Sequence, residues 1–245
     1  MSSKPTMAID GFASLLGTSH KIELSDSYDI DYLSTILYLT PWKSIINGII
    51  RNLCSDASDG CARACLNSSG RGGMRSVQAI RAARTRLFWT NRARFMGFLD
   101  ADVARHERKA LKLRKQGVVR LNGTADIAWE TTGILERFPQ VIFYDYTKSK
   151  KRMKRFLAGE FPPNYSLTFS RSEKNDAECR EILALGGNVS MVWRKALPVS
   201  HLGHDVIDGT IHDLRFLDPR GAIVGLRALG KAQLDDSGFV LDGSK

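Results

Sequence analysis

Short apolar runs that alternate with helical segments are the feature that most limits the fold of this chain. Helices are predicted over residues 76–116, with a break near residues 90–91 or 100–102, and over residues 173–185. Such alternation favours a sheet of mostly parallel strands covered by helices. We therefore expect an α/β fold, a partial or complete (β/α) barrel with mostly parallel strands. The predicted strands are residues 33–39, 118–122, 141–146, 165–170 and 189–193, with a hairpin or strand pair of 211–217 and 222–229.

The length of 245 residues is compatible with one large domain. We expect residues 1–31 to be a polar N-terminal lead-in with a short helix near residues 9–16, and residues 32–245 to form a single barrel-like domain. The longest apolar runs, such as residues 45–50, are too short to span a bilayer. We therefore expect no membrane association and a location in the cytoplasm.

Three of the four cysteines lie within twelve residues, with the spacing Cys-x6-Cys-x3-Cys at Cys54, Cys61 and Cys65. Small and polar residues surround them, so the segment is predicted to be a loop. Three clustered cysteines favour metal or redox chemistry over a disulfide framework. A 4Fe–4S cluster would leave one iron free for a substrate or cofactor, whereas zinc requires a fourth ligand. Unmetallated thiols are the third alternative. Candidate fourth ligands for zinc are distant in the sequence: His201, His204 and His212.

Polar residues collect after the predicted strands. Ligands of parallel sheets and barrels bind at the carboxyl ends of the strands, so these residues are candidates for one binding site. An alternative is that Asp126 caps a helix starting near Ile127, and that Ser170 or Ser172 with Glu173 begins the next helix. The candidates are Gly123, Thr124 and Asp126 after the second strand, and Ser170, Ser172 and Asn175 after a later one.

The net charge of +10 is concentrated in two segments. Residues 71–120 contain fourteen Lys or Arg against three Asp or Glu, and residues 148–155 contain six basic residues in eight. Such clusters are typical of proteins that bind DNA or RNA. A solvated helix face in a basic protein is the alternative interpretation.

Several motifs give the chain a resemblance to the gene product 88 family of phages and plasmids, from about residue 33 to residue 240. That family has no established activity. The cysteine loop also resembles that of radical-SAM proteins, in which three cysteines follow the first barrel strand, although their common spacing is Cys-x3-Cys-x2-Cys. The motifs are CSDASDGCARACLNSSGRG, VRLNGTADIAWE, VIFYDYTKS, NYSLTFSRSEKN and VIDGTIHDLRFLDPRGAIVGLRALGKA.

The radical-SAM resemblance implies a role for each candidate residue. Cys54, Cys61 and Cys65 would ligate three irons of a 4Fe–4S cluster, and the fourth iron would bind S-adenosylmethionine. One electron would cleave this cofactor to a deoxyadenosyl radical that abstracts hydrogen from the substrate. Gly123, Thr124 and Asp126 would contact the amino group of the cofactor, and Ser170, Ser172 and Asn175 its ribose or carboxylate.

Charge and resemblance together predict a phage- or plasmid-encoded iron–sulfur protein of radical-SAM-like type. We expect it to act on a nucleic acid or nucleotide in the host cytoplasm. The alternative is a non-catalytic nucleic-acid-binding protein whose cysteine loop holds a structural zinc or no metal.

Overall fold

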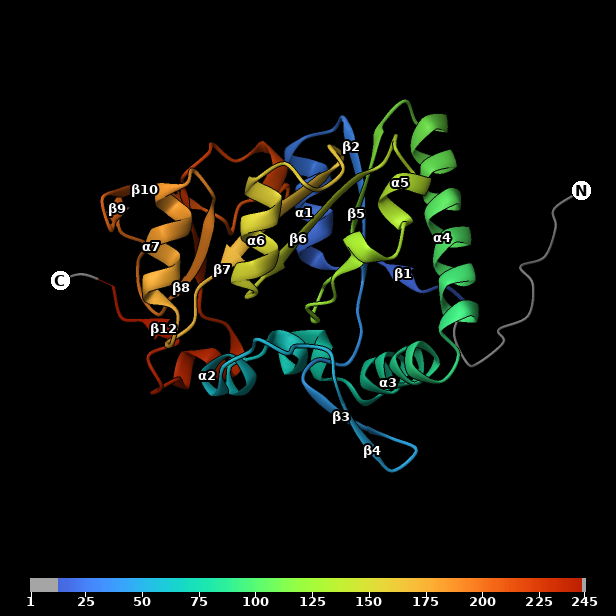
Figure 1. The fold of residues 1–245 in the computed structure, drawn as a ribbon, viewed down its shortest axis with the longest axis horizontal. Helices are drawn as coiled ribbons and strands as arrows, with labels where there is room; N and C mark the ends of the chain where they lie inside the picture. The colour runs from blue at the N-terminus through green and yellow to red at the C-terminus, as the bar shows by residue number, and fades with distance from the viewer. Residues whose placement is uncertain (1–12, 244–245) are drawn as a thin grey trace, which may run out of the picture.

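The computed structural model describes residues 13–243, which form a mixed α/β fold around a mostly parallel sheet (Figure 1). All neighbouring strands from β2 to β10 along the sheet run parallel, which confirms the predicted α/β class. The strands, in spatial order, are β1 (Leu16–Gly17), β2 (Tyr32–Leu37), β5 (Gln116–Arg120), β6 (Ile142–Thr147), β7 (Tyr165–Ser170), β8 (Val189–Trp193), β11 (Ile223–Arg227), β10 (His204–Asp208) and β9 (Ser200–His201), and β12 (Val240–Leu241) pairs with β8.

The sheet does not close on itself within the described residues. Its path ends at β1 on one side and at β9 on the other, and each of these two-residue strands is antiparallel to its neighbour. The prediction of a parallel sheet therefore holds, while the structure contains no closed barrel among residues 13–243.

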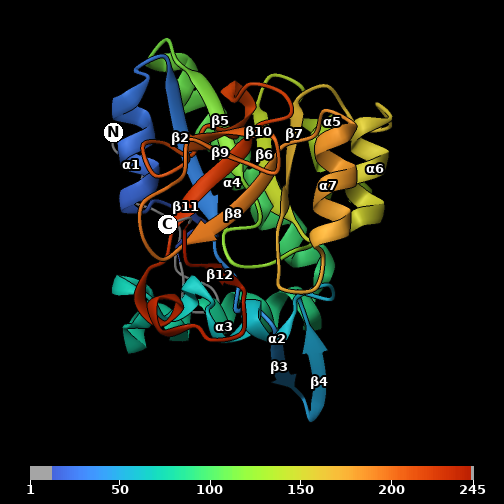
Figure 2. The ribbon, with the colours of Figure 1, turned by 90° about the vertical axis from the view of Figure 1, so that its left-hand side faces the viewer.

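The helices cover the two faces of the sheet unequally (Figures 1 and 2). The outer face carries most of them, and the large apolar core lies beneath, with Leu99, Phe143 and Phe169 fully buried. The opposite face is covered by α1 (His20–Tyr28). The outer helices are α4 (Arg92–Lys112), α5 (Ile134–Arg137), α6 (Lys150–Leu157) and α7 (Asp176–Ala184).

The predicted break near residue 90 separates α3 (Arg75–Thr90) from α4. Asn91 causes it, because its backbone leaves the helical region and its side-chain oxygen accepts a hydrogen bond from the Arg94 N–H. The basic run at residues 148–155 lies largely on α6.

A layer made of a hairpin, helices and loops covers the carboxyl ends of the strands (Figures 1 and 2). It contains the hairpin of β3 (Lys43–Ile46) and β4 (Ile49–Asn52), followed by α2 (Asp59–Arg63) and α3. Backbone hydrogen bonds join the layer to the sheet, from Gly123 N to Leu37 O (3.0 Å) and from Asp126 N to Leu53 O (2.8 Å). The cysteine loop is therefore fixed at the end of the sheet where parallel α/β proteins bind ligands.

Two sequence predictions differ from the structure. The predicted hairpin or strand pair of residues 211–217 and 222–229 is wrong in its first half. Residues 211–217 form no strand, whereas residues 222–229 contain β11, which pairs in parallel with β8 and β10. Both edges of β11 are occupied, by β8 and by β10, so residues 211–217 have no edge of that strand to pair with. Of the helix predicted near residues 9–16, residues 9–12 lie outside the described residues, and Leu16 belongs to β1.

Candidate functional site

The three clustered cysteines come from consecutive parts of the covering layer. Cys54 follows β4, Cys61 lies within α2, and Cys65 follows the residue that caps the end of this short helix. Ser58 caps α2, and its hydroxyl accepts a hydrogen bond from the Cys61 N–H (3.2 Å). The segment is thus a loop interrupted by one helical turn, rather than the continuous loop that the sequence predicted.

All three cysteines line one cavity of about 220 Å³. Trp42, Arg63 and Lys231 also contribute to its wall, and no His, Asp or Glu does. Among residues 13–243, no group of three or more His, Cys, Asp or Glu side chains is arranged to hold a metal ion. The thiols therefore surround a shared space without meeting at a single point.

Burial governs the chemistry of two of these thiols. It raises the pKa of Cys54 to about 12, against the opposing effect of a hydrogen bond that Sγ accepts from the Trp42 N–H (3.4 Å). The same thiol donates to the carbonyl oxygen of Thr124 (3.6 Å). Burial likewise raises the pKa of Cys65. Both side chains are thus neutral thiols near pH 7, and a metal would have to displace their protons.

Glu173, in the turn between β7 and α7, holds the cysteine loop at the carboxyl end of the sheet. Its carboxylate accepts hydrogen bonds from the Ser58 hydroxyl (2.6 Å) and from the Gly60 N–H (3.0 Å). These bonds and a backbone hydrogen bond lower the pKa of Glu173 against the effect of burial. The sequence pattern predicted for Glu173 only a role at the start of a helix. Its position just after a strand of the parallel sheet was the one feature that could have marked it as a site residue.

A second cavity, of about 360 Å³, lies next to the cysteine cavity, and Ala57 lines both. One wall is the cysteine loop at residues 55–59, and the opposite wall comes from the carboxyl ends of β6 and β7 and from α7. Ser172 and Asn175 line it, as do the three lysines Lys148, Lys150 and Lys174.

Ser170, Ser172 and Asn175 share a hydrogen-bonded turn between β7 and α7. Asn175 Oδ1 accepts from the Ser172 N–H (2.6 Å), and its Nδ2 donates to the Ser170 carbonyl (3.1 Å). The Ser170 hydroxyl accepts from Lys148 Nζ (2.7 Å). This turn positions Lys148 beside the second cavity. The helix α7 begins at Asp176, with Asn175 in the cap position, so neither Ser170 nor Ser172 caps it.

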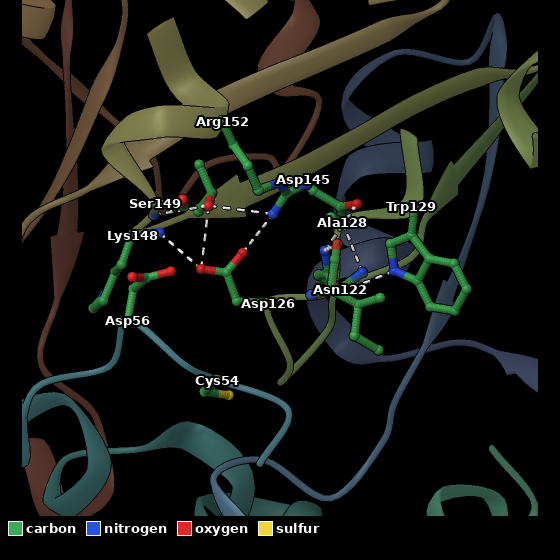
Figure 3. A network of polar contacts seen from close by, with 12 residues as sticks. Cys54, Asp56, Asn122, Asp126, Ala128, Trp129, Asp145, Lys148, Ser149 and Arg152 are labelled. Atoms are coloured by element: carbon green, nitrogen blue, oxygen red, sulfur yellow. Dashed lines mark hydrogen bonds and ion pairs between the residues drawn. The ribbon is translucent and has the colours of Figure 1, made fainter. Parts of the chain in front are cut away.

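Asp126 belongs to a buried network between β5, β6 and α6 (Figure 3). One carboxylate oxygen accepts from Arg152 (2.6 Å), and the other from Thr147 (3.1 Å) and the Lys148 N–H (2.9 Å). Burial raises its pKa in spite of these partners. Asp126 lines neither of the two cavities, and no helix begins at Ile127.

Gly123 and Thr124 lie against the end of β2. A Cβ atom on Gly123 would lie 2.7 Å from the Leu37 carbonyl oxygen, so the close approach that this glycine permits is to the chain itself. The Thr124 hydroxyl donates to the Leu39 carbonyl (2.5 Å). Together these contacts place the Thr124 carbonyl beside Cys54.

Deeper in the same network, Asp145 accepts hydrogen bonds from Asn122 and from the Tyr165 hydroxyl (3.2 Å). Burial raises its pKa to about 7. Asn122 in turn accepts from the Trp129 indole (3.0 Å), so this network fixes residues 122–129 next to Cys54 (Figure 3).

A separate polar cluster lies on the face covered by α1. Asp213 accepts hydrogen bonds from the hydroxyls of Tyr144 and Tyr146 (both 2.9 Å). It also forms ion pairs with Arg120 (2.7 Å) and Lys21 (3.1 Å). The surrounding cations lower its pKa well below the usual range, although burial opposes them.

The two basic segments are divided between the interior and the surface. Arg81, Arg120 and Arg152 are bound inside the protein, to Asn67, Asp213 and Glu130 respectively. The exposed basic residues of the first segment are Arg71, Arg75, Arg86, Arg92, Arg94, Arg105, Arg108, Lys109, Lys112 and Arg114.

The candidate zinc ligands His201, His204 and His212 do not line the cysteine cavity.

Comparison with curated proteins gave no match, and neither did comparison with solved structures. Within residues 13–243, no helix combines the length and the hydropathy that crossing a bilayer requires. The family model of gene product 88 matches residues 16–243, which include both cavities and the whole sheet. The chain therefore belongs to the gene product 88 family.

Proposed function

We propose that the chain is an iron–sulfur protein of radical-SAM-like type that acts on a nucleic acid or nucleotide. The observation that carries the proposal is the position of Cys54, Cys61 and Cys65. They follow the first parallel strand, lie at the carboxyl end of the sheet and line one cavity. Iron–sulfur clusters are held by cysteine thiolates, and three of them leave one iron of a 4Fe–4S cluster open.

Zinc fits this cavity less well. A structural zinc site takes four ligands at one tetrahedral centre. The cavity wall offers sulfur from three cysteines and no His, Asp or Glu, and the thiols do not meet at one point. The three thiols in the lining are the ligand type that a 4Fe–4S cluster with one open iron takes.

The second cavity supports the cofactor proposal because it shares a wall with the first. When bound, the cluster and S-adenosylmethionine would together supply one-electron chemistry for hydrogen abstraction. Ser172 and Asn175 offer polar groups in this cavity, and Lys148 offers positive charge for a carboxylate. Lys150 and Lys174 also line it, but they form ion pairs with Glu181 and Asp59. The segment of Gly123, Thr124 and Asp126 would act indirectly on the cofactor, because its backbone contacts position Cys54.

The exposed basic residues of α3 and α4 support a nucleic acid or nucleotide as the substrate. They come from a segment in which positive charge greatly exceeds negative charge. Such a surface would bind a polyanion in a strongly salt-dependent manner.

The proposal is tested by purifying the protein without oxygen and measuring iron, acid-labile sulfide and the visible spectrum. We expect about four irons with sulfide and a broad brown absorbance, and cleavage of S-adenosylmethionine after reduction. Cys61→Ala should lose most of the iron, whereas Cys179→Ala, a buried cysteine outside the cavity, should retain it.

A colourless protein without iron after anaerobic reconstitution would overturn the proposal. About one zinc per chain and no colour would instead favour a non-catalytic nucleic-acid-binding protein with a structural zinc.

A further inference from the structure

The β3–β4 hairpin projects from the body of the protein beside α3 (Figures 1 and 2). Its two strands pair only with each other among the described residues, with Ile45 opposite Ile50 and Ile46 opposite Ile49. Asn47 and Gly48 form the turn, with φ angles of 50° and 75°. Positive φ at both positions is the geometry of a tight two-residue turn that matches the twist of the strands. The tip is therefore a defined ribbon.

The tip of this ribbon is apolar and exposed. Ile45, Ile49 and Ile50 are 74%, 52% and 66% exposed, and only Ile46 is buried. A two-stranded hairpin is marginally stable alone, and exposed aliphatic side chains on open strand edges favour association. These isoleucines are explained most simply by a binding partner that covers them.

The charge around the hairpin identifies the kind of partner. The Arg51 guanidinium lies 5.0 Å from the centre of the Trp89 ring, which places the stem of the hairpin against the end of α3. Residues 33–55 and 61–99 contain no Asp or Glu, and the second of these segments contains eight Arg. Arg75, Arg86 and Arg92 are exposed there. Chain segments with many exposed cations and no carboxylate are complementary to a polyanion.

We propose that the hairpin is a wedge that inserts between base pairs of a nucleic-acid duplex, while the arginines of α3 and α4 bind the phosphates. Apolar side chains, isoleucine among them, are known to enter base steps, unstack them and bend the duplex. Isoleucine has no hydrogen-bond donor or acceptor in its side chain, so insertion at this tip would not depend on base sequence. The inference rests on the nucleic-acid part of the proposed function and is independent of the cluster.

The stem of the hairpin connects the wedge to the cysteine site. Trp42 precedes β3 and lines the cysteine cavity, and its N–H donates to Cys54 Sγ. The Leu53 N–H donates to the Trp42 carbonyl (3.3 Å) and closes the base of the hairpin. A base step opened by the tip would therefore lie on the side of the molecule that carries both cavities.

The test uses the full chain and a duplex with 2-aminopurine at one position, in DNA and in RNA form, at low salt. Fluorescence should rise on binding, because unstacking relieves the quenching of this base. The double variant Ile45→Ser/Ile50→Ser should abolish the rise and weaken binding by at least about tenfold, because burial of even one aliphatic side chain contributes that much. The matched control Ile30→Ser changes an isoleucine that is 71% exposed before β2, and it should behave as the wild type.

Arg86→Ser should act differently. The slope of log K against log salt concentration should become shallower by about one, the amount expected for one lost phosphate contact. The fluorescence rise at saturation should stay unchanged.

Three outcomes would overturn the inference. They are duplex binding with no fluorescence rise, an unchanged rise in the isoleucine double variant, or no binding of either duplex at low salt. In the last case a protein strand that pairs with the open hairpin edge becomes the better occupant. Iron content separates this test from that of the proposed function, since the double variant should load iron as the wild type does.

Discussion

Glu173 Oε1 lies 3.0 Å from the backbone nitrogen of Gly60, across a sequence separation of 113 residues. A carboxylate from the turn after β7 thus fixes the first turn of the helix that carries Cys61. The side chain of Ser237 approaches the same glycine from the C-terminal segment. The geometry of the cysteine loop is consequently determined by contacts with two distant parts of the chain.

Gly60→Ala should destabilise the protein and disturb the cysteine site. A Cβ atom there would lie 2.7 Å from Glu173 Oε2 and would also collide with the Ser237 hydroxyl. We expect a loss of about 1–3 kcal/mol in the free energy of unfolding, measured with denaturant, as for other overpacked sites. Faster alkylation of the cysteines should accompany it.

The matched control is Gly97→Ala, in an exposed part of α4 where a Cβ atom would meet no atom within 4 Å. Alanine is the better helix former, so this variant should gain about 0.5–1 kcal/mol. Equal effects of the two substitutions would contradict the close contact at Gly60.

Cys54 should resist alkylation in the folded, metal-free protein. Burial raises the pKa of its thiol to about 12, and only the thiolate reacts. We expect slow modification by iodoacetamide at pH 8, with a rate that rises about tenfold per pH unit, whereas in urea the thiol should react as an ordinary cysteine. Peptide mass spectrometry locates the modified residue. Equal rates in folded and unfolded protein at pH 8 would refute the prediction.

The strands and the break between α3 and α4 were predictable because local sequence encodes them. In β7 apolar and small polar residues alternate, β8 is mostly apolar, and Asn91 supplies a local helix cap. The β3–β4 hairpin was predictable but missed, since Asn47-Gly48 between pairs of isoleucines is a strong hairpin signal.

Other features depend on tertiary contacts that no local pattern reports. The β10 strand is largely polar and half-buried, so it lacks the apolar run that marked its neighbours. Asp126 follows a strand as predicted, but Arg152 on α6 and Thr147 at the end of β6 occupy its carboxylate. The contact of Glu173 with Gly60 likewise joins residues that only the folded sheet brings together.

Asp145 should make the protein less stable as the pH rises from about 4 to about 7. Burial raises its folded-state pKa to about 7, whereas the unfolded carboxyl titrates near 3.8. Between these values the folded state holds a proton that the unfolded state releases, so the contribution of this group to the free energy of unfolding falls with pH. The size is roughly a few kcal/mol.

The variant Asp145→Asn removes this titration. The variant should be destabilised, because its amide nitrogen faces the donors Asn122 and Tyr165. In denaturant unfolding, its free energy of unfolding should fall less with rising pH than that of the wild type. The same pH dependence in both proteins would assign the effect to other groups, such as Asp218, whose pKa burial raises to about 6.

Asp213→Asn should be the most destabilising of the carboxylate substitutions. The residue is 1% exposed and is the shared acceptor of Tyr144, Tyr146 and the Arg120 guanidinium. Loss of its charge leaves a buried arginine without its ionic partner, at a cost of about 3–5 kcal/mol. The matched control is Asp242→Asn, which breaks an ion pair with Arg194 at a carboxylate that is 75% exposed, and it should cost less than about 1 kcal/mol.

The destabilisation caused by Asp213→Asn should also grow as the pH rises from about 2 to about 5. The wild-type carboxylate, with its lowered folded-state pKa, gains stability there, and the amide does not. Thermal unfolding of both variants across this range tests the argument, and a small, pH-independent loss at Asp213 would contradict the buried ion pairs that define this face of the sheet.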